Sequence, residues 1–410
     1  MAAPRFNWKL LLNLTLPNKR SGERLSLSSR MLNLKESGTL KILDKVKQLQ
    51  SRGVDVIQLD VGEPDFDTPR NIVEAAYRAM LEGFTHYTPS LGIPELRDAV
   101  AEKLRSENGL DVKRENVLIT PGSKQALFYA VMALVDEGDE VIVPTPAWPS
   151  YIEMVTVAGG TVREVPPREG FSPDIEGIKA AINERTKLMI LNSPNNPTGY
   201  VYTPEELRAL AEIASDSRVY VLSDEIYEKI LYEGEFRSFG SFPGVDDLVI
   251  TVNGFSKTYA MTGWRIGYAA GPRDMVSAMN KLQQHSASCP ASFVQKAALA
   301  ALSPETPVKP MIEEFRRRRD FLCRALNRIG AFHVERPGGA FYLFPEIAAA
   351  GIDSVQMCNL LLEEAHVSTT PGEAFGGFSS NIRISYANSM ENLEDAVSRI
   401  EDALRKKGIA

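Results

Sequence analysis

A lysine follows a buried strand in a segment of small and hydroxyl-bearing residues. The apolar run 248–252 predicts a buried β-strand, and Lys257 lies just beyond it, with Arg265 eight positions further along. A lysine at such a place is costly to bury unless it forms an ion pair or takes part in a reaction, and desolvation lowers its pKa. Because a neutral amine attacks carbonyl groups, the segment predicts a Schiff-base lysine. Taken alone, a surface lysine in a loop would be the commoner explanation.

The composition narrows the classes to which the chain can belong. The chain has 410 residues, of which 44% are hydrophobic. Because a chain of this length is longer than one hydrophobic core usually supports, two domains are favoured. A net charge of −7 gives no basic surface of the kind that binds nucleic acid. The exception is the run 316–319 (RRRR), which lies in a helical pattern and is expected to be a solvated helix face or an interdomain surface. No apolar run is long enough to span a membrane, so no membrane partner is expected.

The cysteines and histidines indicate neither disulfides nor a metal site. The three cysteines are an odd number without a CxxC pair, so they are expected to be buried thiols in a reducing compartment such as the cytoplasm. The four histidines have no metal-ligand spacing. These residues are Cys289, Cys323, Cys358, His86, His285, His333 and His366.

Three parts of the chain differ in character. Residues 1–24 contain no acid before Glu23 and are expected to be a disordered N-terminal extension, with a targeting peptide or a start codon placed too early as alternatives. Residues 65–304, in which apolar strands alternate with helices, are expected to form a large domain that binds the ligand. Residues 305–410 change to a long charged helix and short strands, and we expect them to form a smaller α+β domain with residues 25–64.

Residues capable of chemistry follow the strands of the expected large domain. Continuous apolar strands that alternate with helices predict an α/β fold, with a mostly parallel sheet sandwiched by helices. Ligands of such sheets bind at the carboxyl ends of the strands. One of these ends, 117–124, runs through a glycine turn into a helix, whose N-terminus favours phosphate. The residues just past strand ends are Gly122, Trp148, Asn196, Asp224 and Lys257.

Three motifs, in this order along the chain, carry a family resemblance. They are SPNNPTG at 193–199, SDEIYE at 223–228 and SKTYAMTGWRIG at 256–267. They resemble the class I/II aminotransferases, which have fold type I of the pyridoxal phosphate enzymes, and the resemblance extends from about Leu25 to the C-terminus. The segment 62–66 (GEPDF), and 122–124 (GSK) together with Trp148, are most similar to the prokaryotic-type aspartate aminotransferases.

The resemblance implies pyridoxal 5′-phosphate as the cofactor and a role for each strand-end residue. Lys257 would hold the cofactor covalently and then move the proton of the substrate. Asp224 would pair with the protonated pyridine nitrogen, although alone it would also fit a helix N-cap. Asn196 and Tyr227 would hydrogen-bond the phenolic oxygen of the cofactor. Trp148 would stack on the cofactor ring, whereas an isolated tryptophan is more often a core residue.

The resemblance also places the cofactor phosphate at the glycine turn. The groups that would bind it are the backbone amides of Gly122, Ser123 and Lys124, with Ser256, and with Arg265 as the charged partner. Tyr87 would reach the phosphate of the neighbouring subunit, which implies a homodimer with shared active sites. One position departs from the family: many members carry a serine three residues before the lysine, where this chain has Gly254. That contact is either replaced by Ser256 or absent.

Two cations are expected to recognise the substrate. By resemblance, Arg383 would bind the α-carboxylate bidentately and Gly62 would contact the same carboxylate through its backbone. Alone, Arg383 would more often be a salt-bridged strand arginine. Lys124 would face the distal carboxylate of an acidic amino acid, with a lysine in solvent as the alternative. Trp148 and Asn196 complete the expected contacts.

These residues predict an aspartate:2-oxoglutarate aminotransferase that gives oxaloacetate and glutamate by a ping-pong mechanism. Alternatives on the same scaffold are an alanine or aromatic aminotransferase, a prephenate aminotransferase and a β-lyase. For prephenate, Lys35 and Thr39 lie where such enzymes recognise it, but Glu36 and Ser37 differ from the usual Pro-Ser. A cofactor-binding effector domain of a transcription regulator is disfavoured, because residues 1–24 have no winged-helix pattern.

Overall fold

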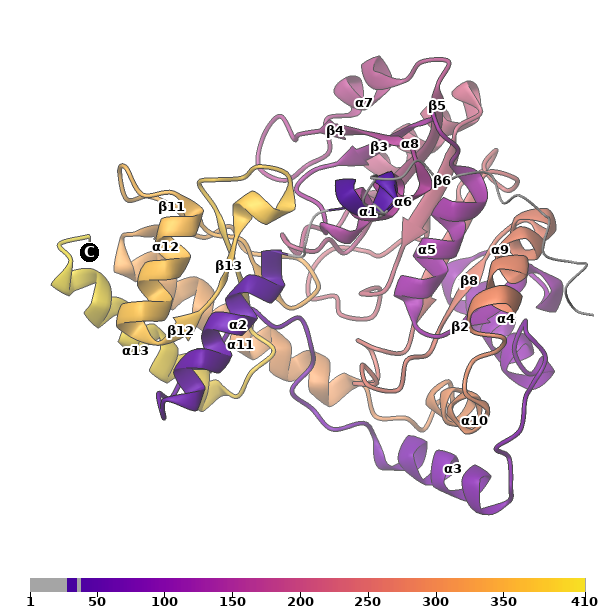
Figure 1. The fold of residues 1–410 in the computed structure, drawn as a ribbon, viewed down its shortest axis with the longest axis horizontal. Helices are drawn as coiled ribbons and strands as arrows, with labels where there is room; N and C mark the ends of the chain where they lie inside the picture. The colour runs from indigo at the N-terminus through magenta and orange to yellow at the C-terminus, as the bar shows by residue number, and fades with distance from the viewer. Residues whose placement is uncertain (1–27, 35–37, 410) are drawn as a thin grey trace, which may run out of the picture.

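A seven-stranded sheet forms the centre of the molecule. The computed structural model describes residues 28–34 and 38–409. The strands are β2 (Val117–Thr120), β3 (Glu140–Pro144), β4 (Thr161–Val165), β5 (Thr186–Asn192), β6 (Tyr220–Asp224), β7 (Val249–Gly254) and β8 (Gly267–Ala270). Their order is β2-β8-β7-β6-β5-β3-β4, and β8 runs antiparallel to both neighbours while the others are mutually parallel. All of these strands except β7 are labelled in Figure 1. This arrangement confirms the predicted α/β fold.

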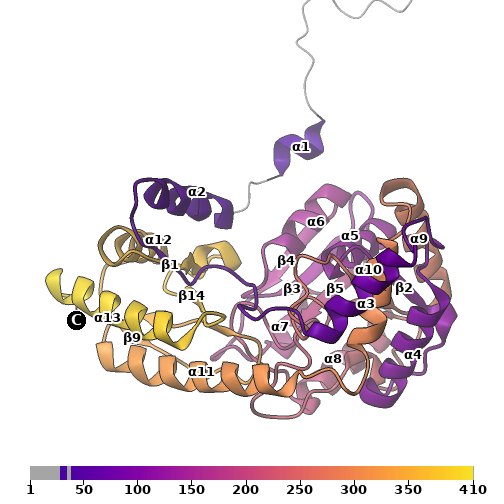
Figure 2. The same cartoon turned by 90° about the horizontal axis from the view of Figure 1, so that it is seen from below.

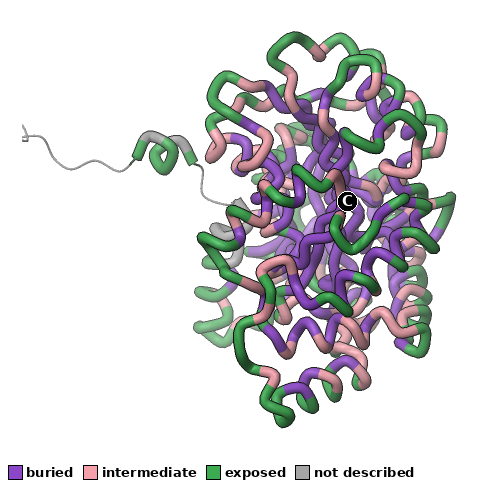
Figure 3. Tube along the Cα trace, turned by 90° about the vertical axis from the view of Figure 1, so that its right-hand side faces the viewer, coloured by how far each residue is buried: buried purple, intermediate pink, exposed green. Residues whose placement is uncertain are grey.

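Helices cover both faces of this sheet because its strands are apolar on both faces. They are α3 (Arg70–Leu81), α4 (Pro94–Asn108), α5 (Ser123–Leu134), α6 (Ser150–Ala158), α7 (Ile175–Ala181), α8 (Pro204–Ser217), α9 (Arg273–Ser286) and α10 (Ser292–Ala301). In β3, Val141 and Val143 pack with α5, α6 and α9, whereas Ile142 packs with α7 and α8 on the opposite face. On that opposite face, α4 and α10 share a hydrophobic cluster with β2 and β8, and α3 packs on α10. Apart from the edge strand β4, the strands are therefore buried inside a helical shell (Figure 3).

A second group of elements, which we call the C-terminal region, packs beside the sheet (Figure 2). It consists of α2 (Gly38–Ser51), β1 (Ile57–Gln58), α11 (Lys309–Ile329), β9 (Phe332–His333), β10 (Tyr342–Leu343), β11 (Glu346–Ile347), α12 (Ser354–Leu360), β12 (Val367–Ser368), β13 (Thr370–Pro371), β14 (Ile382–Ser385) and α13 (Met390–Lys406). β1 pairs in parallel with β12, so the segment before residue 60 joins the end of the chain. The predicted division into two domains at residues 65 and 304 stays a prediction.

Half of the arginine run 316–319 is buried, so the prediction of a solvated helix face was wrong for that half, while the alternative of an interdomain surface stays a prediction. The first two arginines are exposed, but Arg318 and Arg319 are buried. Arg318 pairs with Asp65 at 2.6 Å, and Arg319 donates to the carbonyl of Pro337 at 2.9 Å. Because an α-helix turns about 100° per residue, four consecutive side chains cannot share one face of α11.

Two local predictions need correction. The pair Thr68-Pro69 predicts a helix start with the threonine as N-cap and the proline at the first position. Helix α3 instead begins at Arg70 with Pro69 at the N-cap position, and the Thr68 hydroxyl donates to the carbonyl of Ala260. Strand β4 was not predicted, because it is an edge strand whose side chains are mostly exposed and polar. By contrast, the segment 203–206 (TPEE) predicts a capped helix start, and a capping box is present at the start of α8, where the side chains of Thr203 and Glu206 accept hydrogen bonds from each other's backbone amides.

The cysteines are free thiols in the structure. Cys323 and Cys358 are buried, as predicted, whereas Cys289 is half-buried. Burial raises the pKa of the Cys323 thiol to about 11 and that of Cys358 to about 12, so both keep their protons near neutral pH.

The N-terminal part of the chain is described only from residue 28. Helix α1 (Ser29–Asn33) contacts α6. The predictions for residues 1–24 and for Lys35 lie outside the described residues, as does the side chain of Thr39. In the part of the chain that the structure describes, no helix combines the length and apolar character needed to cross a membrane.

Candidate active site

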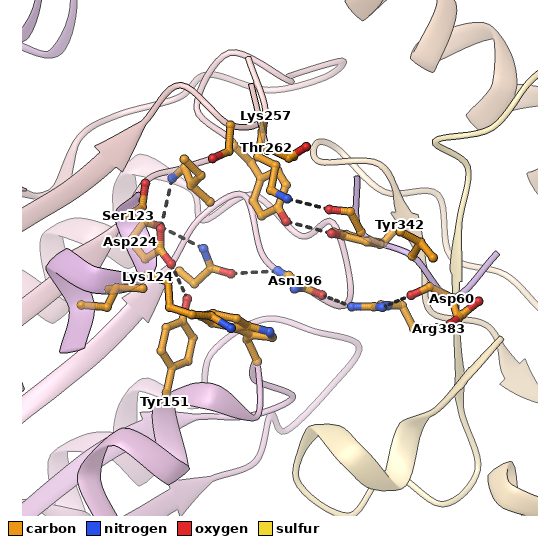
Figure 4. A pocket seen from close by; sticks show the side chains of 18 of the residues that line it. Asp60, Ser123, Lys124, Tyr151, Asn196, Asp224, Lys257, Thr262, Tyr342 and Arg383 are labelled. Atoms are coloured by element: carbon orange, nitrogen blue, oxygen red, sulfur yellow. Dashed lines mark hydrogen bonds between the residues drawn. The ribbon is translucent and has the colours of Figure 1, made fainter. Parts of the chain in front are cut away.

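A cavity of about 450 Å³ lies where the sheet meets the C-terminal region (Figure 4). Strands β5, β6 and β7 end beside it and α5 begins beside it, because the carboxyl ends of parallel strands meet at one edge of a sheet. The opposite wall includes the segment after β1 and residues of β10 and β14. The cavity is therefore built from both regions of the molecule.

The structure brings most of the predicted site residues to this cavity. Those that line it are Gly62, Ser123, Lys124, Trp148, Asn196, Asp224, Tyr227, Ser256, Lys257, Arg265 and Arg383. Gly122 lies at the edge of the cavity as the N-cap of α5. Tyr87 is not brought to the cavity of its own chain, and its side chain is 91% exposed.

Asp224 is a buried carboxylate at the end of β6. It accepts hydrogen bonds from the Tyr151 hydroxyl at 2.6 Å and from the backbone amide of Ile226 at 3.2 Å. Burial raises the pKa of Asp224 to about 6, although these two hydrogen bonds oppose the rise. The residue therefore ionises near neutral pH, and a cation in the cavity would stabilise its charged form.

Lys257 follows β7 and turns its amine into the cavity. Its Nζ donates to the carbonyl of Gly62 at 2.6 Å. Burial, together with the charges of Arg383 and Arg265, lowers the pKa of Lys257 to about 8 against the opposing charges of Glu63 and Asp224. A larger fraction of the amine is thus neutral at neutral pH than for an ordinary lysine, as a nucleophilic lysine requires.

The turn before α5 forms a cradle for an anion. Gly122 has φ +86°, a region that favours glycine, and a Cβ there would lie 2.5 Å from Nη2 of Arg265. The absence of a side chain therefore lets the Arg265 guanidinium approach the N-terminus of α5. The free backbone amides of that helix start and the arginine charge together favour a phosphate group.

The structure explains the glycine that departs from the family pattern. A Cβ at Gly254 would collide with the hydroxyl of Ser123, which donates to the carbonyl of Asn253 at 2.8 Å. The Ser123 side chain occupies the space that a serine at position 254 would need. Ser256 is buried and lines the cavity, so a hydroxyl remains available near the cradle.

Lys124 lies over an aromatic ring at the cavity. Its Nζ is 4.4 Å from the centre of the Trp148 ring. Partial burial lowers the pKa of Lys124, and the charge of Arg265 lowers it further. Lys124 as a whole is exposed, but its amine lies against the Trp148 ring and the residue lines the cavity.

Arg383 is buried and held on several sides. Its Nη1 donates to Oδ1 of Asn196 at 3.0 Å, and its Nη2 donates to the carbonyl of Asp60 at 2.6 Å. The rings of Tyr342 and Phe375 lie 4.7 and 5.1 Å from the guanidinium. Its buried Nε has no hydrogen-bond partner among the described residues, and a carboxylate would supply one.

Sequence reasoning missed several residues of the cavity. They are Asp60, Val61, Leu127, Tyr151, Asn192, Ile226, Thr262 and Tyr342. For Tyr151 a signal existed, because it lies three positions after Trp148 at a helix start, a spacing that places both side chains on one side. For Tyr342 none existed, since it stands in an apolar run that predicts only a buried strand.

Comparison with known proteins agrees with this geometry. The family model for aminotransferase class I and II matches residues 54–400. The chain belongs to this family. This aminotransferase is 47% identical to the aspartate/prephenate aminotransferase of Thermus thermophilus over 384 residues, which cover 92% of this chain and 98% of that protein. It is 46% identical to the aspartate aminotransferase of Geobacillus stearothermophilus over 386 residues, with the same coverage of 92% and 98%.

Solved structures agree with the fold of this aminotransferase. The aspartate aminotransferase of Thermus thermophilus with maleate has a TM-score of 0.88 and 46% identity, covering 93% of this chain and 100% of that chain. The aromatic aminotransferase of Pyrococcus horikoshii has a TM-score of 0.85 and 40% identity, covering 89% and 100%. The predicted family and fold are therefore confirmed.

Proposed function

We propose that this aminotransferase binds pyridoxal 5′-phosphate in the cavity and transfers the amino group of L-aspartate to 2-oxoglutarate. The residues present fit the cofactor in three respects. The helix start at α5 and Arg265 form a cradle for its phosphate. The buried carboxylate of Asp224 suits its protonated pyridine nitrogen, and the amine of Lys257 suits its aldehyde carbon.

When bound, the cofactor supplies an electron sink for the electrons of the substrate Cα–H bond. Lys257 would hold the cofactor and would take and return the proton at Cα, which its lowered pKa favours. Asp224 would keep the pyridine nitrogen protonated through its negative charge. Asn196 accepts from Arg383 through Oδ1, so its Nδ2 would be the atom that donates to the phenolic oxygen, together with Tyr227. Trp148 would cover the cofactor ring.

The pair of cations in one cavity is the observation that carries the choice of substrate. Arg383 reaches the cavity from β14 and Lys124 from the start of α5. An amino acid with two carboxylates satisfies both cations with charge-assisted hydrogen bonds, whereas an apolar side chain leaves Lys124 without an anion. The backbone of Gly62 and the faces of Trp148 and Asn196 complete the substrate contacts. The names of the relatives above support aspartate as the amino donor.

The proposal includes a homodimer. Tyr87 is exposed on its own chain and belongs to the loop between α3 and α4. In a dimer of the kind that the family resemblance implies, this side chain would contact the cofactor phosphate of the partner. The exposure of this tyrosine on its own chain is consistent with that arrangement.

The visible absorbance spectrum tests the proposal. Purified protein with added pyridoxal 5′-phosphate is expected to develop a visible band, which L-aspartate alone should remove and 2-oxoglutarate should restore. Initial rates at several fixed co-substrate concentrations should give parallel double-reciprocal lines. A missing band would overturn the cofactor assignment. A band that does not change on addition of L-aspartate would overturn the substrate assignment.

A second candidate substrate is prephenate, because the Thermus thermophilus relative is named for it as well as for aspartate. The same spectral assay distinguishes the candidates. Prephenate replaces 2-oxoglutarate as the acceptor, and L-alanine or an aromatic amino acid replaces L-aspartate as the donor. Release of pyruvate and ammonia from cystathionine without an oxo-acid acceptor would instead identify a β-lyase.

A further inference from the structure

Tyr342 connects two parts of the site that sequence reasoning treats separately. It begins β10, is almost fully buried and lines the cavity. Its hydroxyl lies 2.8 Å from the hydroxyl of Tyr227, and its ring lies 4.7 Å from the guanidinium of Arg383 (Figure 4). One side chain thus contacts both the proposed substrate clamp and the residue proposed to contact the phenolic oxygen of the cofactor.

The direction of the hydrogen bond between the two tyrosines follows from their protons. Each phenol has one proton to donate. When Tyr227 donates its proton to the phenolic oxygen of the cofactor, only Tyr342 can donate within the pair. A phenol that accepts a hydrogen bond becomes a stronger donor, since hydrogen bonds in a chain polarise one another. Burial raises the pKa of both hydroxyls, so both stay protonated at neutral pH.

The same hydroxyl explains why residue 62 is a glycine. A Cβ at Gly62 would collide with the Tyr342 hydroxyl. The Gly62 carbonyl accepts from Nζ of Lys257, and the carbonyl of Asp60 accepts from Nη2 of Arg383, both at 2.6 Å. The hydroxyl therefore packs against the backbone segment that binds both the lysine and the substrate clamp.

We propose that Tyr342 is a positioning residue, which acts through the hydroxyl of Tyr227 and the backbone of Gly62. This inference rests on the proposed function, because it requires the cofactor beside Tyr227. Without the Tyr342 hydroxyl, Tyr227 is a weaker donor and the negative charge on the phenolic oxygen is less stabilised. Protonation of the linkage between Lys257 and the cofactor then becomes easier. The pKa of this linkage, which is read from the visible band, therefore rises.

A pH titration of the visible band tests the first part of the proposal. In Tyr342→Phe loaded with pyridoxal 5′-phosphate, the midpoint is expected to rise by roughly 0.5 to 1 pH unit relative to the unmodified enzyme. Tyr386→Phe is the matched control, because Tyr386 is equally buried in the C-terminal region and donates to the carbonyl of Ala340 at 3.2 Å, outside the cavity lining. Its midpoint should not move.

An unchanged midpoint in Tyr342→Phe, or an equal shift in Tyr386→Phe, would overturn the positioning role. Failure of the unmodified enzyme to form a visible band would instead overturn the proposed function, so the two failures are distinguishable.

A double-substitution experiment tests the contact with Gly62. Gly62→Ala is expected to lower kcat/KM for aspartate by roughly tenfold or more and to lower the unfolding temperature, because the new methyl group displaces the Tyr342 hydroxyl or the backbone. In the Tyr342→Phe background both penalties should shrink, since the colliding oxygen is gone. Equal penalties in the two backgrounds would contradict the proposed contact. The unfolding temperature reports on the contact even where a variant has no activity.

Discussion

The two walls of the cavity are built in different ways. The sheet wall includes the residues that follow β3, β5, β6 and β7 or begin α5, and these are fixed by their own strand ends. The C-terminal wall includes Gly62, Tyr342 and Arg383, which are far apart in the sequence. Its residues reach the sheet wall through three hydrogen bonds, from Arg383 to Asn196, between Tyr342 and Tyr227, and from Lys257 to Gly62.

This difference separates two tasks. A sheet edge holds its residues rigidly. Residues that stabilise the charges of a cofactor need such fixed positions. A wall held by a few hydrogen bonds can adjust when a substrate carboxylate competes for the same donors. We therefore expect substitutions on the sheet wall to affect the chemical step, and substitutions on the C-terminal wall to affect mainly substrate binding.

The largest effect is expected from Asp224→Asn on the sheet wall. This substitution keeps the shape of the side chain but removes the charge that stabilises a protonated pyridine nitrogen. We expect kcat to fall roughly 10³-fold, as for the loss of a preorganised electrostatic group in other active sites. Stopped-flow absorbance after mixing with aspartate measures the rate of the first half-reaction, in which the amino group leaves the substrate. A Tyr151→Phe variant, which removes one hydrogen bond to the carboxylate and leaves its charge, should lose far less. Comparable losses in both variants would contradict the electrostatic role.

A smaller effect is expected from Arg383→Lys on the C-terminal wall. Lysine keeps the charge but lacks the fork that binds a carboxylate bidentately. We expect kcat/KM for aspartate to fall roughly 10²-fold, mainly through KM, while the visible band persists. Steady-state kinetics and the absorbance spectrum check both parts. Loss of the cofactor band would show that the two walls do not divide the tasks.

Lys124→Ala sharpens the comparison, because this residue lies on the sheet wall and yet is proposed to recognise substrate. We expect kcat/KM for aspartate to fall roughly 10- to 100-fold, and that for alanine to change little. The ratio of the two specificity constants is the measurement. An unchanged ratio would exclude Lys124 from substrate recognition and favour an alanine or aromatic substrate.

The smallest effect concerns a carboxylate behind the sheet wall. Oε1 of Glu225 accepts from Ser223, Ser238 and the amide of Phe239, while its buried Oε2 has no partner among the described residues. Burial raises the pKa of Glu225 to about 7, and the charge of Glu228 contributes. The folded protein thus keeps a proton that the unfolded chain releases, so this group's contribution to stability falls as pH rises from about 4.5 to about 7.

Glu225→Gln removes this titration. Relative to the unmodified enzyme, the variant should gain on the order of 2 kcal/mol in free energy of unfolding between pH 5 and pH 8. Urea unfolding of the cofactor-free protein at both pH values measures the gain, with the exposed Glu235→Gln as the control. A pH-independent difference would show that Glu225 is already ionised at pH 5.

The sequence by itself determined the sheet, except for its edge strand β4, and most of the sheet wall. Apolar runs of the right length predict strands, glycine and helix signals follow them, and the carboxyl ends of parallel strands meet at one edge. Asp224, Asn196 and Lys257 can therefore be assigned to one site from the sequence alone, because their neighbours along the chain fix their positions. The family motifs added their expected roles.

Only the tertiary structure decided how the C-terminal wall meets the sheet. Tyr342 stands in an apolar run, and its contacts with Tyr227 and Gly62 join segments more than a hundred residues away. The burial of Arg319, the collision that keeps residue 254 a glycine and the raised pKa of Glu225 depend likewise on packing between distant segments. Local sequence carries strand and helix periodicity, but it does not record which distant side chain fills a given space, and that packing sets the fine geometry of the site.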